Sequence, residues 1–454
     1  MGCKEVYMIF FRKPARLRQY IASLLMLIMV SAVPMPVHAA PAPFAGSGTE
    51  ADPCLITSAE DLLKLAELVN DGGTAYATAG VCYKLTQDIN LSIYGKSYNS
   101  GKGWVPIGDW DPLKPFNGNF NGDGHKITGL YINDDIADAG LFCIISASAT
   151  VEKVTLNGAE IKAINNVGGI AGEVKGTITD CAYLALDDGT DLVRGTFNSV
   201  GGIAGYVDTG GTVKNCCATG RVNGVAYVGG VAGTVDGTVH DCYSTSYVSG
   251  SNHVGGVAGQ VDGTVQNCYS TGIIGGMSLV GGITGLRFGT VQHCAALNLY
   301  VSADNSCAGR VAGFKNAGTL SDNMAFGGMN ISVNGSVKDI SATAKHNDVD
   351  GETRAAGVLQ TSNDFPSAMT QSPWVYESGK LPGLGEAIDM PSYLVPPVSD
   401  LAITTDRLPG GAVGTTYNVK LEASGGSDDP TNYTWSATGL PLGMRLTLTG
   451  RLCG

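Results

Sequence analysis

Five cysteines recur in similar surroundings along this chain, and the last four of them lie 26 residues apart. They are Cys181, Cys216, Cys242, Cys268 and Cys294. Cysteines can bind a metal or form disulfides, but a tetrahedral metal site needs converging ligands, whereas one cysteine per repeat gives a line. Disulfides between successive repeats remain open, although neighbouring in-register parallel strands suit disulfide geometry poorly. Because a free thiol is a small, easily buried hydrophobe, we predict that the five cysteines form a structural ladder in the core.

Three aspartates share a second repeated position, at intervals of 28 and 26 residues: Asp208, Asp236 and Asp262. Each lies in a Val-Asp-Gly or Val-Asp-Thr turn, where aspartate is common because its side chain caps its own backbone. A column of carboxylates about 5 Å apart would also repel itself, and a Ca²⁺ ion would relieve that repulsion. The turn interpretation and a weak Ca²⁺ site both remain open, and the sequence indicates no other cofactor.

Other polar and aromatic residues recur beside these columns. Directly before four of the cysteines stand polar residues that we expect to hydrogen-bond from repeat to repeat. They are Asn215, Asp241, Asn267 and His293. Four tyrosines either pack within the stack or offer a surface for sugar rings. They are Tyr227, Tyr243, Tyr247 and Tyr269.

The sequence contains no recognisable catalytic constellation. It has no His-Glu-x-x-His motif and no Gly-x-Ser-x-Gly elbow between a strand and a helix, and its six histidines are scattered. The enzyme class that remains open is a polysaccharide lyase or hydrolase, since many of these are right-handed β-helices that gather carboxylates and basic residues on one face. No basic residue shares the position of the three aspartates, so we predict that the chain is not an enzyme.

The elements that carry these residues are copies of one segment. Intact copies begin at Val200, Val228, Val254 and Val280, a weaker copy begins at Val167, and a degraded copy reads AGRVAG. Each copy has short runs of Val, Ile, Thr and Tyr between glycine turns, and none has room for a helix. A period near 26 residues is typical of one coil of a right-handed parallel β-helix. We therefore predict an all-β solenoid whose coils stack at about 4.8 Å.

The repeat VGGVAGQVDGTVQNCYSTG resembles the Glug motif of bacterial surface proteins, and the resemblance covers residues 139–330. Glug repeats occur in adhesin-like proteins and in some IgA-cleaving metallopeptidases, whose peptidase motif is missing from this sequence. The resemblance implies a surface-exposed, adhesion-associated β-helix. It does not by itself imply catalysis.

Residues 1–40 are typical of a secretory signal peptide, because basic residues at 12–18 precede an apolar run at 21–33 and then small residues. An uncleaved anchor is the alternative, but the apolar run is short for a membrane span. Removal of residues 1–39 leaves 23 basic and 39 acidic residues, a net charge of −16, which disfavours nucleic acid and anionic membranes as partners. We expect a secreted or bacterial cell-surface protein with no membrane insertion after cleavage.

Residues 41–138 are expected to form an N-terminal cap and the first coils of the solenoid. Thr57 and Glu60 have the spacing of a capping box that opens an amphipathic helix, and Gly72 ends it. Such a helix would cover the open end of the solenoid. Cys54 and Cys82 lie on the strands that flank the helix, and we name them as a candidate disulfide pair.

The repeat decays after residue 330. Residues 331–390 are predicted to be an irregular segment ending in a closing strand, and the proline-containing residues 391–400 a linker. Residues 401–454 resemble the Ig-like sandwich modules of bacterial surface proteins, with Tyr417, Leu421 and Trp435 in the core. The last strands of such a sandwich are missing from the sequence, so we expect a partial Ig-like β-sandwich.

These features together predict a non-enzymatic surface β-helix that acts in adhesion or surface display through multivalent binding. The expected partner is a host or environmental glycan, a matrix protein or a cell-envelope component. A carbohydrate-active β-helix enzyme and a passive stalk are the alternatives.

Overall fold

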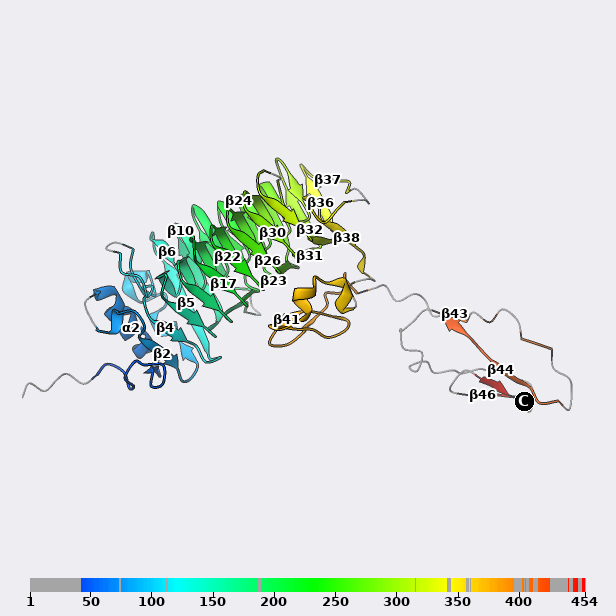
Figure 1. Cartoon of the computed structure of the whole chain (residues 1–454), viewed down its shortest axis with the longest axis horizontal. Helices are drawn as coiled ribbons and strands as arrows, with labels where there is room; N and C mark the ends of the chain where they lie inside the picture. Colours follow the sequence, from blue (N-terminus) through cyan, green and yellow to red (C-terminus); the bar gives the residue numbers. More distant parts are fainter. Residues whose placement is uncertain are drawn as a thin grey trace, which may run out of the picture. The chain divides into compact units, whose positions relative to one another are not determined.

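The computed structural model describes residues 42–453, with gaps at 73–74, 111–112, 187–188, 315, 341–343, 357–358, 360, 396–401, 404, 406–407, 411–414, 425–439, 441–443 and 448–450. The predicted signal peptide, residues 1–40, lies outside the described residues. Most of the described chain is a parallel β-solenoid of about ten coils (Figure 1). The predicted all-β repeat fold is therefore confirmed.

The solenoid forms because each copy of the repeat pairs in register with the next. Val200 aligns with Val228, Val228 with Val254, and Val254 with Val280, and all four valines are buried. Parallel pairing places the same residue of every copy at the same position of its coil. The repeated valines, isoleucines and cysteines thus become continuous columns in one core.

Three parallel sheets run along the solenoid. The first contains β1 (Cys54–Ile56), β2 (Cys82–Leu85), β4 (Asn119–Asn121), β8 (Thr150–Glu152), β12 (Thr177–Thr179), β17 (Thr212–Lys214), β22 (Thr238–His240), β26 (Thr264–Gln266), β30 (Thr290–Gln292) and β34 (Thr319–Ser321). The second contains β7 (Phe142–Ile145), β11 (Ala171–Val174), β16 (Ala204–Val207), β21 (Ala232–Val235), β25 (Ala258–Val261) and β29 (Thr284–Arg287).

The third sheet is the widest, because most coils contribute more than one strand to it. It contains β3 (Ile89–Asn90), β5 (Lys126–Asn133), β6 (Ala137–Ala139), β9 (Thr155–Ala163), β10 (Asn165–Gly168), β13 (Ala182–Leu184), β14 (Leu192–Gly195), β15 (Asn198–Gly201), β18 (Cys217–Ala218), β19 (Val222–Asn223), β20 (Ala226–Gly229), β23 (Tyr243–Ser244), β24 (Val248–Gly255), β27 (Tyr269–Ser270), β28 (Ile274–Gly281), β31 (Ala295–Ala296), β32 (Tyr300–Ala303), β33 (Ala308–Gly309), β35 (Met324–Phe326), β36 (Asn330–Val333), β37 (Ser336–Val337) and β38 (Glu352–Arg354).

The predicted N-terminal helix is α2 (Ala59–Asp71), which lies at the N-terminal end of the solenoid and buries Leu62, Leu65 and Val69 (Figure 1). Its capping differs from the prediction by one residue. Ser58 is the N-cap and accepts a hydrogen bond from the Asp61 backbone, while the Asp61 carboxylate accepts one from the Thr57 backbone. Both Thr57 and Ser58 are good N-caps, so spacing alone could not choose between them. Gly72 ends the helix in a left-handed conformation, as predicted.

The segment after the last coil packs against the solenoid. Residues 361–395, here called the strap, return along the solenoid and bury Phe365, Met369 and Leu394. Within the strap, β39 (Trp374–Val375) pairs with β41 (Gly383–Leu384), and β40 (Lys380–Leu381) pairs with β42 (Ile388–Asp389). The predicted linker at 391–400 is therefore anchored in its first half. Leu394, in that first half, is fully buried.

Two small antiparallel sheets lie near the C-terminus. One joins β43 (Ala402–Ile403) to β45 (Ala423–Ser424), and the other contains β44 (Asn418–Lys420), β46 (Arg445–Leu446) and β47 (Arg451–Cys453). Tyr417 and Leu421 are half-buried, and Trp435 lies outside the described residues. The Ig-like assignment stays a prediction. The remaining short helices are 3₁₀ turns at Ala75–Ala77, Ser92–Tyr94, Asn99–Gly101, Ser362–Asp364 and Ser367–Thr370. Within the described residues, no helix is long and apolar enough to cross a membrane.

Candidate functional site

The five ladder cysteines lie one above another inside the solenoid. All five are free thiols, and each is at most 1% exposed. Each thiol donates to the backbone carbonyl two residues before it, as Cys242 does to His240 at 3.2 Å, so each has a hydrogen-bond acceptor. Burial raises the pKa of the Cys242 thiol, which keeps it protonated. All five thiols are shielded from solvent and each donates a hydrogen bond to the backbone, so these residues fit a structural role.

The candidate disulfide between Cys54 and Cys82 is not formed in this structure, where both are free thiols. Strand β1 aligns Cys54 with Tyr83, one residue beyond Cys82. Successive residues of a strand point to opposite faces, so Cys54 points into the core while Cys82 is half-buried on the other face. The sequence placed both cysteines on neighbouring strands but could not give this register.

The three aspartates of the candidate Ca²⁺ site do occupy one position on successive coils, because Val207, Val235 and Val261 align directly before them. Their carboxylates have protein partners. The Tyr206 hydroxyl donates to Asp236 at 2.6 Å and to Asp208 at 3.3 Å, and the Gln260 amide donates to Asp262 at 2.6 Å. Among the described residues, no group of three or more His, Cys, Asp or Glu side chains is arranged to hold a metal ion. Turn formation is consistent with these bonds, and the weak Ca²⁺ site stays a prediction.

The polar residues before the cysteines share an unusual backbone conformation. Asn215, Asp241, Asn267 and His293 all have φ of 52–53°, in the left-handed region. Asparagine and aspartate tolerate this region better than other non-glycine residues, which explains their recurrence. The Asn267 amide donates to Asp241 at 3.2 Å, and Asn215 donates to Asp180 in the coil before at the same distance. These two bonds link the coils of Asp180 and Asn215 and the coils of Asp241 and Asn267.

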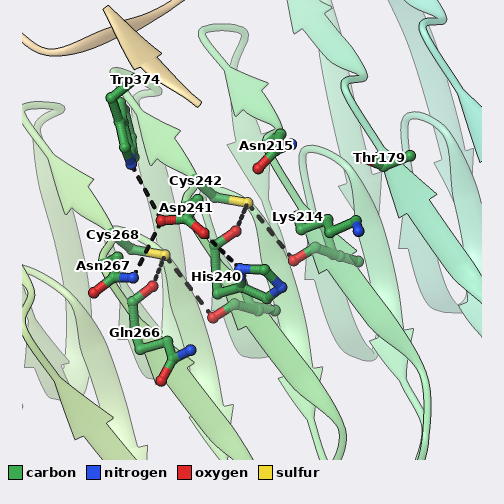
Figure 2. A network of polar contacts seen from close by, with 12 residues as sticks. Thr179, Lys214, Asn215, His240, Asp241, Cys242, Gln266, Asn267, Cys268 and Trp374 are labelled. Atoms are coloured by element: carbon green, nitrogen blue, oxygen red, sulfur yellow. Dashed lines mark hydrogen bonds and ion pairs between the residues drawn. The ribbon is translucent and has the colours of Figure 1, made fainter. Parts of the chain in front are cut away.

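Asp241 is the centre of a polar network on the solenoid surface (Figure 2). Its carboxylate accepts hydrogen bonds from His240 Nδ1 at 2.6 Å, from Asn267 at 3.2 Å and from the Trp374 indole at 3.2 Å. Burial raises the pKa of Asp241, but the bonds from His240, Trp374 and Asn267 outweigh burial and hold it below its usual value. The network contains an ionised carboxylate that fixes the strap to the solenoid.

The strap covers two of the four tyrosines proposed for sugar stacking. Tyr243 and Tyr269 are stacked at 5.2 Å between ring centroids, and the Trp374 ring packs on both. The Tyr269 hydroxyl donates to the Pro382 carbonyl at 2.7 Å. Both tyrosines are buried, so they are not available as a sugar surface. A third, Tyr227, is half-buried and stacked on His253 at 4.9 Å.

We expect Trp374→Ala to release the strap, because it removes the ring from Tyr243 and Tyr269 and the indole donor from Asp241. Loss of a buried tryptophan costs about 3–5 kcal/mol. Hydrogen exchange and limited proteolysis should show exposure of residues 361–395 while the coils remain protected. The control is Val375→Ala, a change at the neighbouring exposed residue, which should leave the strap protected. Equal exposure of the strap in both variants would contradict its anchoring by Trp374.

The fourth tyrosine belongs to an exposed row on the third sheet. Tyr247, Ile273 and Tyr300 directly precede the buried residues Val248, Ile274 and Val301, and are 46–48% exposed. These buried residues align from coil to coil, so the exposed ones form a row. Towards the N-terminus the same outer surface carries Arg221, Arg194 and Lys162, all exposed. We call these six residues the outer strip. The sequence analysis identified only Tyr247; the position before each inward Val or Ile would have revealed Arg221, Ile273 and Tyr300, whereas Lys162 and Arg194 directly follow the inward Ile161 and Val193.

A buried acid lies on another column of left-handed turn residues. Asp138 is 2% exposed, has φ of 54° and accepts a hydrogen bond from the Asn166 amide at 2.7 Å. Burial raises its pKa to about 6; the hydrogen bond from Asn166 opposes the shift, nearby Glu173 adds to it, and Lys175 opposes it. Ionised Asp138 is therefore less favourable in the folded protein than in the unfolded chain.

We expect Asp138→Asn to stabilise the solenoid at pH 7 and not at pH 4. The pKa of this carboxyl group is 3.8 in the unfolded chain and about 6 in the folded protein. The stability that neutral Asp138 allows is therefore fully present below pH 3.8 and is lost as the pH rises through about 6. The full shift corresponds to at most about 3 kcal/mol. Asparagine tolerates the left-handed backbone and can still accept from Asn166. Thermal unfolding at both pH values tests this, and equal effects at pH 4 and pH 7 would contradict it.

Parts of this sequence are similar to two known proteins. No family model matches the chain. Halomucin from Haloquadratum walsbyi is 34% identical over 173 residues, which are 38% of this chain and 2% of halomucin. A "Putative Gly-rich membrane protein" from Evansella cellulosilytica is 37% identical over 114 residues, 25% of this chain and 12% of that protein. The chain thus spans a small part of these relatives.

A solved structure resembles most of the chain. The crystal structure of a "putative immunoglobulin A1 protease" from Bacteroides ovatus covers 75% of this chain and 94% of its own, with a TM-score of 0.51 and 21% sequence identity. At this identity the likeness concerns the fold alone. The coils and their repeated outer surface define a parallel β-solenoid protein.

Proposed function

We propose that this chain is an exported, non-catalytic β-solenoid of a bacterial cell-surface protein, which acts in adhesion or display through repeated contacts. The Glug-like repeat is the finer family assignment within this proposal. The outer strip is the observation that carries it. Tyr247, Ile273 and Tyr300 repeat one exposed position on successive coils, so a single chain offers several similar contacts to one polymer or surface. Linked contacts strengthen binding without any single strong one.

The relatives support a location at the cell envelope. One is a halomucin and another is described as a membrane protein. We propose that the partner is a host or environmental glycan, a matrix protein or a component of a cell envelope. A rigid solenoid suits this task, because the spacing of its contacts is set by strand stacking at about 4.8 Å.

A carbohydrate-active enzyme is the second candidate, and one observation favours it. Glu160 and Lys162 lie on β9, and Arg194 aligns with Lys162 on the next coil, which places acid and basic groups together on one face. Glu160, however, is exposed and forms an ion pair with Lys96 at 2.7 Å. A general acid acts best with a raised pKa, which burial rather than an ion pair would supply.

Retention on coated surfaces tests the proposal. Beads carrying the chain at high and low density are passed over immobilised glycans, matrix proteins and isolated cell envelopes. We expect retention on at least one surface, rising steeply with bead density because the contacts are multivalent. A passive stalk would be retained on none, which would contradict the proposal. Calcium chelation should leave retention unchanged, since the Asp208, Asp236 and Asp262 carboxylates already have protein donors or turn partners; loss of retention would restore the Ca²⁺ hypothesis.

A further inference from the structure

The outer strip has two chemically different halves that lie along the same face of the third sheet. Towards the C-terminus it presents Tyr247, Ile273 and Tyr300 on three successive coils. Beside this row, two residues further along the strands, lie small polar residues aligned with one another. They are Asn223, Ser249, Gly275 and Ser302. Apolar rings next to a row of hydroxyl and amide groups match a sugar, whose ring has an apolar face and a polar rim.

The spacing of this half suits a chain of sugars. Tyr247 and Tyr300 are two coils apart, which at about 4.8 Å per coil separates the two rings by roughly 10 Å. This is about the length of two pyranose rings in an extended polysaccharide. A polymer that runs along the solenoid axis would therefore meet an aromatic ring at every second sugar, with Ile273 beneath the sugar between them.

Towards the N-terminus, the strip carries three cations that form no ion pair with another described residue. Lys162 aligns with Arg194, and the Arg221 carbonyl accepts a hydrogen bond from Val193 on the coil before it. The ion pairs found among the described residues include none of the three cations; neighbouring Glu160 is paired with Lys96 at 2.7 Å and Asp134 with Lys102 at 2.9 Å. Three exposed like charges on successive coils repel one another in a chain with 28 basic and 40 acidic residues.

Arg221 connects the two halves of the strip. Its guanidinium lies 5.9 Å from the centre of the Tyr247 ring, a cation–π distance. Arg221 aligns with Tyr247 in the aromatic row, whereas Arg194 aligns with Asn223, two residues further along the strand, so the three cations lie across both rows of the outer strip. An anion would relieve the repulsion among the three cations, as it does in other basic clusters.

We propose that the outer strip binds a linear acidic polysaccharide, such as a polyuronate, that runs along the solenoid axis. Its carboxylates would pair with Lys162, Arg194 and Arg221, and its rings would stack on Tyr247 and Tyr300. This inference rests on the proposed adhesive function and names the partner class. Neutral polysaccharides and proteins lack the combination of regular ring spacing and negative charge that the two halves require.

Binding of the full chain to immobilised alginate, compared with the same alginate after reduction of its carboxyl groups, tests this inference. We expect the double variant Lys162→Gln/Arg194→Gln to bind alginate at least tenfold more weakly than the wild type does. A tenfold loss of affinity requires the loss of only one or two ion pairs with the polymer. Tyr247→Ser/Tyr300→Ser should weaken binding to both polymers. Tyr247→Phe/Tyr300→Phe should keep it, because the rings remain.

Matched controls separate the strip from general charge. Lys214→Gln/Lys345→Gln removes two positive charges elsewhere and should bind alginate like the wild type, and thermal unfolding should show that every variant is folded. Equal binding of wild type to alginate and its carboxyl-reduced form would overturn the acidic ligand. Unchanged binding in both strip variants, or no binding of alginate at all, would overturn the strip as its site, while retention on other surfaces would leave the adhesive function standing.

Discussion

Gly281→Ala is expected to destabilise the solenoid by about 3–5 kcal/mol, more than an ordinary overpacked core substitution. Gly281 is the first glycine of a Val-Gly-Gly motif, and a Cβ added there would lie 2.1 Å from the Thr284 carbonyl oxygen and 2.6 Å from the Gly313 backbone nitrogen. These atoms belong to the backbone that links neighbouring coils. They cannot move without disturbing hydrogen bonds such as that from Gly313 to the Thr284 carbonyl.

The same strand provides the control for Gly281. Gly275 also lies on β28, but a Cβ there would meet only the Ser302 hydroxyl, at 3.3 Å. We expect Gly275→Ala to change stability by less than about 1 kcal/mol, since the loss of unfolded-state freedom offsets the small contact. Chemical denaturation followed by circular dichroism measures both variants. Equal stabilities would contradict the assignment of the repeated glycines to contacts between coils.

Arg310→Gly is expected to unfold the C-terminal end of the solenoid at a cost of about 3–5 kcal/mol. Arg310 occupies the interior position held by Gly282 in the coil before it, and it is 1% exposed. Its guanidinium donates to the Asp350 carbonyl at 2.8 Å, to the Gly351 carbonyl at 3.1 Å and to the Thr353 hydroxyl at 2.7 Å. Without it, these acceptors are left unpaired around a cavity.

Hydrogen exchange resolves where the effect of Arg310→Gly falls. Because each coil contacts only its neighbours, we expect β35, β36 and β38 to lose protection while the coils before β24 retain it. Arg310→Lys retains the positive charge but not the planar guanidinium group. We therefore expect its loss of exchange protection to lie between that of the wild type and that of Arg310→Gly. Uniform loss of protection along the whole solenoid would contradict a local role for Arg310 in closing its end.

The repeat made the solenoid predictable from the sequence. Residues that depart from the repeat could not be placed in the same way. Equal spacing of Val200, Val228, Val254 and Val280 required in-register stacking, so the core columns followed from the sequence. Arg310 seemed to mark decay of the repeat, since a charged residue replaces a glycine. Its role depends on acceptors about 40 residues later in the chain, which no periodicity connects to it.

The candidate site was harder to predict, because exposure depends on distant segments. Tyr243 and Tyr247 both belong to one repeat, but Trp374 covers the first and leaves the second exposed. The indole of Trp374 is held there by Asp241, 133 positions earlier in the chain, and the strap has no repeat that would reveal its path. The register of Cys54 against Tyr83 was equally hidden, because one residue of shift moves a side chain to the opposite face.

The most direct test of the central claim, that this solenoid binds without cleaving, measures both quantities on the same sample. The full chain is incubated with candidate glycans, matrix proteins and immunoglobulin A1, and mass spectrometry records the bound fraction together with any new reducing ends or new peptide termini. We predict retention of an intact ligand. Products that accumulate with time beyond one equivalent of the chain would contradict the claim and identify an enzyme.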